Sequence, residues 1–271
     1  MYDLQENESA APESATPDEF DALPDEAVSA QSAEPHLRPE MLRALSAASR
    51  ALGEAQGVRS VLELVSALSV GAVLGVDEAS VTVRRPNGRL EMTAPTGAMA
   101  ERADQLQFQT GGGPCIDVVR SEQRRIRADD IAADERWPAL RRMAGELAVR
   151  SILSIRLSGD DDEGAVEGLN LYSRTPHAFA GVAELSGELF GAHAAVALRA
   201  ARHREQVVNL HRALETNRDI GVAMGIIMAR RLVTRGQAYE LLRRASQHSQ
   251  RKLADIAAEV ADIGILEFDP T

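Results

Sequence analysis

The chain has 271 residues, an apolar fraction of 44% and a formal net charge of −11. At about 100–200 residues per domain, this length predicts one or two domains. Its apolar runs fall short of the ~18–20 residues that span a bilayer, and the N-terminal residues lack the pattern of a secretory signal. The single cysteine, Cys115, excludes an intrachain disulfide and fits a reducing compartment. We therefore expect a cytoplasmic protein with no membrane partner.

The negative charge is concentrated at the start of the chain. Residues 1–34 hold ten acidic side chains and no lysine or arginine, and the rest of the chain has 31 acidic and 30 basic residues. An anionic partner is therefore not excluded for the remainder. Because a charged segment with few apolar residues cannot offset its ordering entropy, we predict a disordered acidic tail over residues 1–37.

The segment after the tail begins with two predicted helices and a hairpin. Apolar residues recur at helical spacing over residues 38–57, and a more apolar helix is expected over residues 60–76. The alternating segment 79–85, the turn signal "PNG" and residues 89–94 predict two antiparallel strands. A polar stretch then leads to "GGGPCIDVVRSEQ", where we expect a loop and a short helix.

Further strands are predicted in the middle of the chain. Residues 124–128 indicate an edge strand, and residues 131–149 an interrupted helix. Residues 150–159 and 164–174 are expected to be strands on either side of an acidic loop. This mixture predicts an α+β fold with an antiparallel sheet flanked by helices.

The C-terminal part is predicted to be entirely helical. No proline interrupts residues 180–231, and Val207, Leu210 and Leu214 have the 3-4 spacing of a coiled-coil-like seam. Thr234 is a suitable N-cap for a helix over residues 235–249, and Gly264 closes a last helix over residues 251–264. A long helix is thus expected to lead into a bundle of three helices.

Two glycines, Gly221 and Gly225, lie in the apolar run near the end of this long helix. A glycine inside a helix costs about 0.5–1 kcal/mol relative to alanine, so a compensating contact is expected. We favour close packing of another helix over the alternative, an approaching nucleic-acid backbone. The predicted helix-packing residues are Ile220, Gly221, Ala223, Gly225, Ile227 and Met228.

The same helical region carries an excess of positive charge. Residues 207–264 contain nine basic and six acidic side chains, a net charge of +3. Contacts between basic side chains and phosphates supply most non-specific affinity for nucleic acids, although a solvated helical face is the plain alternative. Tyr239 is the only aromatic residue there. It could stack on a base, but a core or helix-interface position is favoured.

Three segments in this region, "RDIGVAMGIIMAR", "LVTRGQAYELLRRASQ" and "SQRKLADIAAEV", resemble the ANTAR domain. The resemblance implies a three-helix RNA-binding module that binds paired hairpin loops in nascent transcripts and prevents terminator formation. It implies a homodimer, in which two modules match two loops. The family commonly has a basic residue where Met224 stands, which shifts the expected charge to Arg230 and Arg231. The RNA-binding residues that we predict are Arg230, Arg231, Arg235, Tyr239, Arg243, Arg244, Arg251 and Lys252.

Four earlier segments, "GGGPCIDVV", "DDIAADERWPAL", "VRSILSIRL" and "LNLYSRTPHAF", resemble a GAF domain of the kind joined to ANTAR modules. This resemblance implies a sensor fold that takes an unidentified small-molecule ligand. No cofactor is evident. Cys115 and Trp137 are candidates to line its pocket, although packing in the core is favoured for both.

No carboxylate pair, catalytic triad or metal-ligand spacing is found, so we expect no enzyme and no metal site. The predicted domains are the acidic tail (1–37), a GAF sensor domain (38–204) and an ANTAR RNA-binding domain with its linking helix (205–271). The predicted function is signal-responsive transcription antitermination. The alternatives are a ligand-sensing signalling protein whose C-terminal helices associate with another protein, and DNA binding by these helices.

Overall fold

A computed structural model describes residues 38–158 and 164–266 of the chain. The predicted acidic tail lies outside the described residues, as do the acidic residues of the loop near position 160. The described elements follow the α+β order that the sequence predicts, with five strands in the first part and helices at the end.

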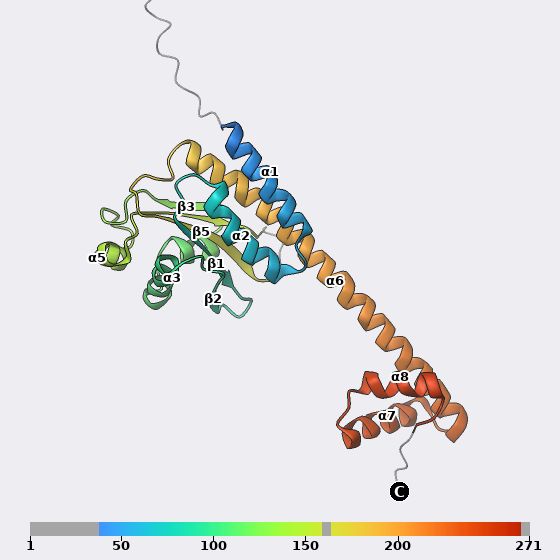
Figure 1. Cartoon of the computed structure of the whole chain (residues 1–271). Coiled ribbons are helices and arrows are strands. Elements are labelled where there is room, and N and C mark those ends of the chain that lie inside the picture. The colour runs from blue at the N-terminus through green and yellow to red at the C-terminus, as the bar shows by residue number, and fades with distance from the viewer. Residues whose placement is uncertain (1–37, 159–163, 267–271) are drawn as a thin grey trace, which may run out of the picture. The chain divides into compact units, whose positions relative to one another are not determined.

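The strands form a single antiparallel sheet (Figure 1). They are β1 (Glu78–Arg84), β2 (Leu90–Thr93), β3 (Arg125–Ala128), β4 (Ser151–Arg156) and β5 (Val166–Ser173), in the order β2-β1-β5-β4-β3. Val81 pairs with Leu169, and Leu153 pairs with Leu171. The predicted hairpin and the edge strand at 124–128 are confirmed.

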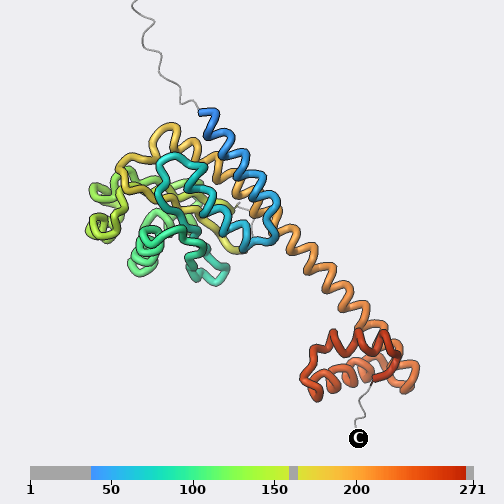
Figure 2. Tube along the Cα trace, viewed as in Figure 1, coloured from blue at the N-terminus to red at the C-terminus, as the bar shows by residue number. Residues whose placement is uncertain are grey.

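One face of the sheet is covered by α1 (Pro39–Glu54), α2 (Val58–Ala72) and the first part of α6 (Val182–Arg231). The α1 helix runs alongside this part of α6 (Figures 1 and 2). Leu153 and Ile155 of β4 point into this core, because alternate residues of a strand face the same side. A Cβ added at Gly191 would lie 2.7 Å from Cγ2 of Ile155, so α6 needs glycine to approach β4 this closely.

The other face is covered by α3 (Ala98–Thr110), α4 (Pro114–Arg120) and α5 (Pro138–Leu147). Ile152 and Tyr172 point into this second core. The short α4 and the α5 part of the interrupted helix agree with the predictions. The sequence did not predict α3, because two of its five buried residues are polar: Asp104 and Gln107 are as buried as Ala100 and Ala103.

The chain ends with α7 (Arg235–Ser249) and α8 (Leu253–Ile263), which pack with the last turns of α6 around a third core. All three helices were predicted from the sequence. Among the described helices, none combines the length and apolar character that crossing a membrane requires.

Candidate nucleic-acid interface

The turn between α6 and α7 fixes where α7 begins. Leu232 adopts a left-handed conformation with φ of 52° and ends α6. Thr234 then caps α7: its Oγ1 accepts a hydrogen bond from the Gln237 amide at 3.4 Å, and Oε1 of Gln237 accepts one from the Thr234 amide at 2.9 Å. This capping box confirms the predicted N-cap, and such caps contribute about 1 kcal/mol.

The three helices share a small apolar core. Its residues are Ala223, Met224 and Ile227 of α6, Ala238, Leu242 and Ala245 of α7, and Ile256, Ala257 and Val260 of α8. Met224 is a core side chain here, so a basic residue at this position would lose its solvation. The predicted packing face is corrected at Met228, which is exposed, because the buried stripe of α6 is centred on Ala223 and Ile227.

The two glycines of α6 do not make the predicted helix contact. Both Gly221 and Gly225 are exposed, and a Cβ added at either would have no described neighbour within 4 Å. They lie away from the stripe that faces α7 and α8, so close packing within the chain does not explain them. The favoured prediction, close packing of another helix onto these glycines, was therefore wrong for α7 and α8.

Basic residues gather around the turn between α7 and α8. Gln250 takes a left-handed conformation with φ of 54°, which ends α7. The Ser246 hydroxyl donates a hydrogen bond to the carbonyl oxygen of Arg251 at 2.6 Å, which ties the turn to the last turns of α7. This contact brings Arg251 and Lys252 near the end of the helix that carries Arg243 and Arg244.

Two of these arginines are engaged by carboxylates. Arg243 pairs with Glu240 at 2.9 Å, and this carboxylate raises the pKa of the guanidinium. Arg251 pairs with Glu259 at 2.7 Å. Because a paired arginine presents less net charge to a phosphate, these two residues contribute less to the local field than their number suggests.

Four other predicted residues keep their charge uncompensated. Within residues 38–158 and 164–266, no ion pair involves Arg230, Arg235, Arg244 or Lys252. All four are exposed, as is Arg231. Positive charge without carboxylate partners is what a polyanion would meet first.

Tyr239 lies on the surface of α7. Its relative exposure is 43%, and it is not among the residues of the three-helix core. The favoured core position was therefore wrong: the α7 stripe that faces the other helices runs through Ala238 and Leu242, one residue away. A base could reach the exposed ring.

A sequence model of the ANTAR domain matches residues 208–260, which include this capping box, this core and the basic turn. The chain carries an ANTAR domain. ANTAR domains are RNA-binding modules of antitermination regulators. The uncompensated cations therefore belong to a domain of a type that binds RNA.

Solved structures similar to the chain include the GAF domain of a phosphoenolpyruvate-protein phosphotransferase from Coxiella burnetii. The two sequences are 18% identical, the match covers 62% of this chain and 97% of that chain, and the TM-score is 0.45. The corresponding GAF domain from Acinetobacter gives 14% identity, coverage of 63% and 99%, and a TM-score of 0.45. The photosensory core module of a Stigmatella aurantiaca phytochrome gives 10% identity, coverage of 83% and 47%, and a TM-score of 0.53.

The phytochrome likeness shows the fold alone, an α+β arrangement as the sequence predicted. GAF domains are among the solved structures to which the chain is similar. No curated protein matches the chain.

The two pocket candidates of the N-terminal part are buried beside the sheet. Cys115 is fully buried in α4, and burial raises the pKa of its thiol well above the ordinary value. Its backbone amide donates to Oε1 of Gln107 at 3.0 Å. The indole nitrogen of Trp137 donates to Asp117 at 2.8 Å, and the Arg136 guanidinium lies 4.2 Å from the ring centroid. Both side chains fill the core, and their role as pocket residues stays a prediction.

No sequence pattern indicated the buried carboxyl group that lies beside Cys115. Asp104 is fully buried, receives a hydrogen bond from Tyr172, and leaves its Oδ2 atom without a hydrogen-bond partner among the described residues. Also among these residues, no group of three or more His, Cys, Asp or Glu side chains is placed to hold a metal ion.

Proposed function

We propose that this protein is a cytoplasmic antitermination regulator that binds paired hairpin loops in nascent RNA and prevents terminator formation. The proposal assigns sensing to a GAF domain over residues 38–204 and RNA binding to residues 205–271. The observation that carries it is the set of uncompensated, exposed cations inside the matched ANTAR domain. A small-molecule ligand of the GAF domain supplies the signal.

The chemistry of the basic turn suits an RNA loop. Arg244 and Lys252 contact phosphates, which sets the position of the RNA and makes its affinity depend on salt. Splayed bases of a loop can stack on aromatic rings, and Tyr239 offers the exposed ring on the same helix as Arg244. The paired residues Arg243 and Arg251 reach the RNA only by exchanging a carboxylate for a phosphate.

We further propose that two copies pair through α6 and so present two ANTAR domains to two loops. Val207, Leu214 and Gly221 recur every seven residues along α6, and Leu210 lies between the first two. Leu210 is 60% exposed, and most of the helix from His203 to Leu214 has no described neighbour that covers it. An apolar stripe with this period is the seam of a coiled coil, and an exposed helix needs such a partner to remain stable in water.

The test is a gel shift of the full chain with an RNA that contains two hairpin loops. The Arg244→Ala/Lys252→Ala double variant removes two uncompensated cations, so we expect weaker binding and a salt dependence with a slope lower by about 2. Arg43→Ala, an exposed arginine of α1, is the control and should bind as the wild type does. Equal binding by the double variant and the wild type at low salt would refute the proposal.

Two further measurements separate this proposal from its alternatives. A duplex DNA competitor that displaces the RNA as well as unlabelled hairpin RNA does would favour DNA binding. A protein partner that is captured equally with and without ribonuclease, and that RNA does not displace, would favour a protein-association role for α7 and α8.

A further inference from the structure

A cleft lies between the β3–β4 edge of the sheet and α6. Its volume is about 350 Å³, and Ile155 and Leu157 form its apolar floor. It exists because α6 touches β4 closely at Gly191, whereas the next α6 residues on this side, Ala192 and Ala195, are too small to fill the space. No residue of the ANTAR domain lines it.

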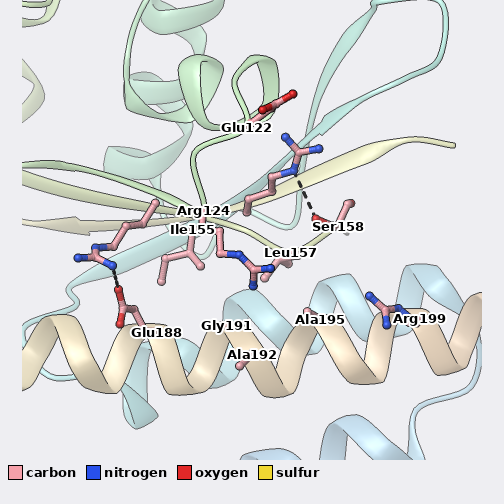
Figure 3. Close-up of a pocket in the computed structure, with 12 residues that line it drawn as sticks. Glu122, Arg124, Ile155, Leu157, Ser158, Glu188, Gly191, Ala192, Ala195 and Arg199 are labelled. Atoms are coloured by element: carbon pink, nitrogen blue, oxygen red, sulfur yellow. Dashed lines mark hydrogen bonds and ion pairs between the residues drawn. The ribbon is translucent and has the colours of Figure 1, made fainter. Parts of the chain in front are cut away.

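The polar residues around this cleft are mainly arginines. Arg124, Arg125, Arg156 and Arg199 line it together with Glu122 and Glu188 (Figure 3). The excess of guanidinium groups over carboxylates gives the cleft a positive character. Cationic side chains at the border of an apolar floor are the arrangement that binds an organic anion.

Two of the four arginines are held in place by the protein itself. Arg125 pairs with Glu184 at 2.8 Å and also with Glu188. The Arg156 guanidinium donates to the carbonyl oxygens of Ser121 and, at 3.3 Å, of Ser158. These contacts fix one wall of the cleft and neutralise Glu188.

The other two arginines, Arg124 and Arg199, have guanidinium N–H groups that are available to a ligand. Neither the Arg124 nor the Arg199 guanidinium has a hydrogen-bond or ion-pair partner in the described part of the chain. Arg124 comes from the β3 side and Arg199 from α6, and both line the cleft, while Glu122 lies on the side away from α6 (Figure 3). Planar guanidinium groups match carboxylates and phosphates with two parallel hydrogen bonds.

We infer that this cleft binds a small organic anion, whose carboxylate or phosphate group is held by Arg124 and Arg199. The apolar part of the ligand packs on Ile155 and Leu157. The volume lies at the lower end of the range of small-molecule sites, roughly 300–1,000 Å³, which suits a small molecule and not a polymer. A bound ligand would contact α6 at Ala195 and Arg199, and the same helix continues into the ANTAR domain.

The experiment is a calorimetric titration of the full chain with phenyl phosphate and with benzoate. Benzyl alcohol is the neutral probe of similar size. We expect saturable binding of at least one anion, and the preferred one identifies the anionic group. Binding of neither anion, or equal binding of benzyl alcohol, would overturn the inference. No RNA is present, so the outcome does not depend on the proposed RNA binding.

Variants assign the binding to the two arginines. Arg124→Gln and Arg199→Gln each remove a charge-assisted hydrogen bond, so each should weaken binding about tenfold. Arg43→Gln, an exposed arginine on α1, should bind as the wild type does. All three arginines of this comparison are exposed and glutamine is of similar length, and thermal unfolding confirms that the variants are folded. Unchanged affinity in both cleft variants would contradict the inference.

A steric variant tests the cleft itself. Ala195→Leu adds volume to the lining of the cleft without changing charge, and it should also weaken binding about tenfold. If Arg124→Gln and Arg199→Gln weaken binding but Ala195→Leu does not, the anion binds on the outer surface and the cleft is not its site. If the two arginine variants lose affinity for a single-stranded RNA but not for the small anions, the arginines serve a polymer and the inference is wrong.

Discussion

The Tyr172 hydroxyl donates a hydrogen bond to the Asp104 carboxylate in the core beneath the sheet. Tyr172 comes from β5 and Asp104 from α3, and both side chains are completely buried. Burial raises the pKa of Asp104 from 3.8 to about 6, although the nearby hydroxyl groups of Ser80 and Tyr172 and the Cys115 thiol lower it. Desolvation is therefore the stronger effect at this carboxyl.

This carboxyl makes stability depend on pH. Because its pKa in the folded protein is above its ordinary value, protonation favours the folded state: the contribution is complete below about pH 3.8 and is lost as the pH rises through about 6. A difference of about two pKa units corresponds to a free energy of unfolding on the order of 3 kcal/mol. We expect Asp104→Asn to remove this dependence, as measured by urea unfolding between pH 4 and pH 8.

The difference between the wild type and the variant isolates the effect from other titrating groups. Asp262→Asn, at an exposed position on α8, is the control and should keep the pH dependence of the wild type. An identical pH profile for the wild type and Asp104→Asn would show that the carboxyl does not titrate in this range.

The helix that carries Asp104 shows where sequence patterns stop being informative. The strands and most helices could be predicted because their buried residues are apolar and recur with the period of the element. In α3 the buried positions include Asp104 and Gln107, which form hydrogen bonds with Tyr172, a residue distant in the sequence. No local period can report such a contact.

The contact between α6 and β4 depends on glycine. A Cβ at position 191 would lie 2.7 Å from Cγ2 of Ile155, a branched core side chain that cannot move aside easily. We expect Gly191→Ala to lower the free energy of unfolding by about 1–3 kcal/mol through overpacking. Gly53→Ala, in α1 with no neighbour within 4 Å of its added Cβ, should instead stabilise the protein slightly. Thermal unfolding of both variants checks the opposite signs.

The proposed pairing of two α6 helices predicts a sharp difference between neighbouring positions. Leu210→Lys places a charge on the stripe from each copy, so the dimer should dissociate, because like charges would face each other across the seam. Asn209→Lys, one residue away and off the stripe, adds the same charge and should leave the dimer intact. Sedimentation measures the mass of each variant. A wild type that is monomeric, or a dimer that tolerates Leu210→Lys, would contradict the pairing.

Some features of the ANTAR site could be predicted from the sequence, and others could not. The cations at Arg244 and Lys252 could be identified because charge and position are both visible in the sequence. Their pairing could not: Arg243 and Arg251 have carboxylate partners and Arg244 and Lys252 do not. In the same way, the sequence shows that a glycine lowers the stability of a helix. It does not show which residues lie against that glycine, because this depends on the side of α6 on which α7 and α8 pack.

Gly225 offers the most direct test of whether another helix or a ligand lies against the glycines of α6. Its position on α6 is exposed, and an added Cβ would meet no described atom within 4 Å, so Gly225→Ala should raise the free energy of unfolding by about 0.5–1 kcal/mol through helix propensity alone. Ala229→Gly, an exposed position one turn later, should lower it by a similar amount. A loss of stability in Gly225→Ala would instead support the interpretation that another helix packs closely against this glycine. If stability rises while affinity for hairpin RNA falls, the open glycine serves the approach of a nucleic-acid backbone, because the added methyl group would then obstruct the ligand and not the fold.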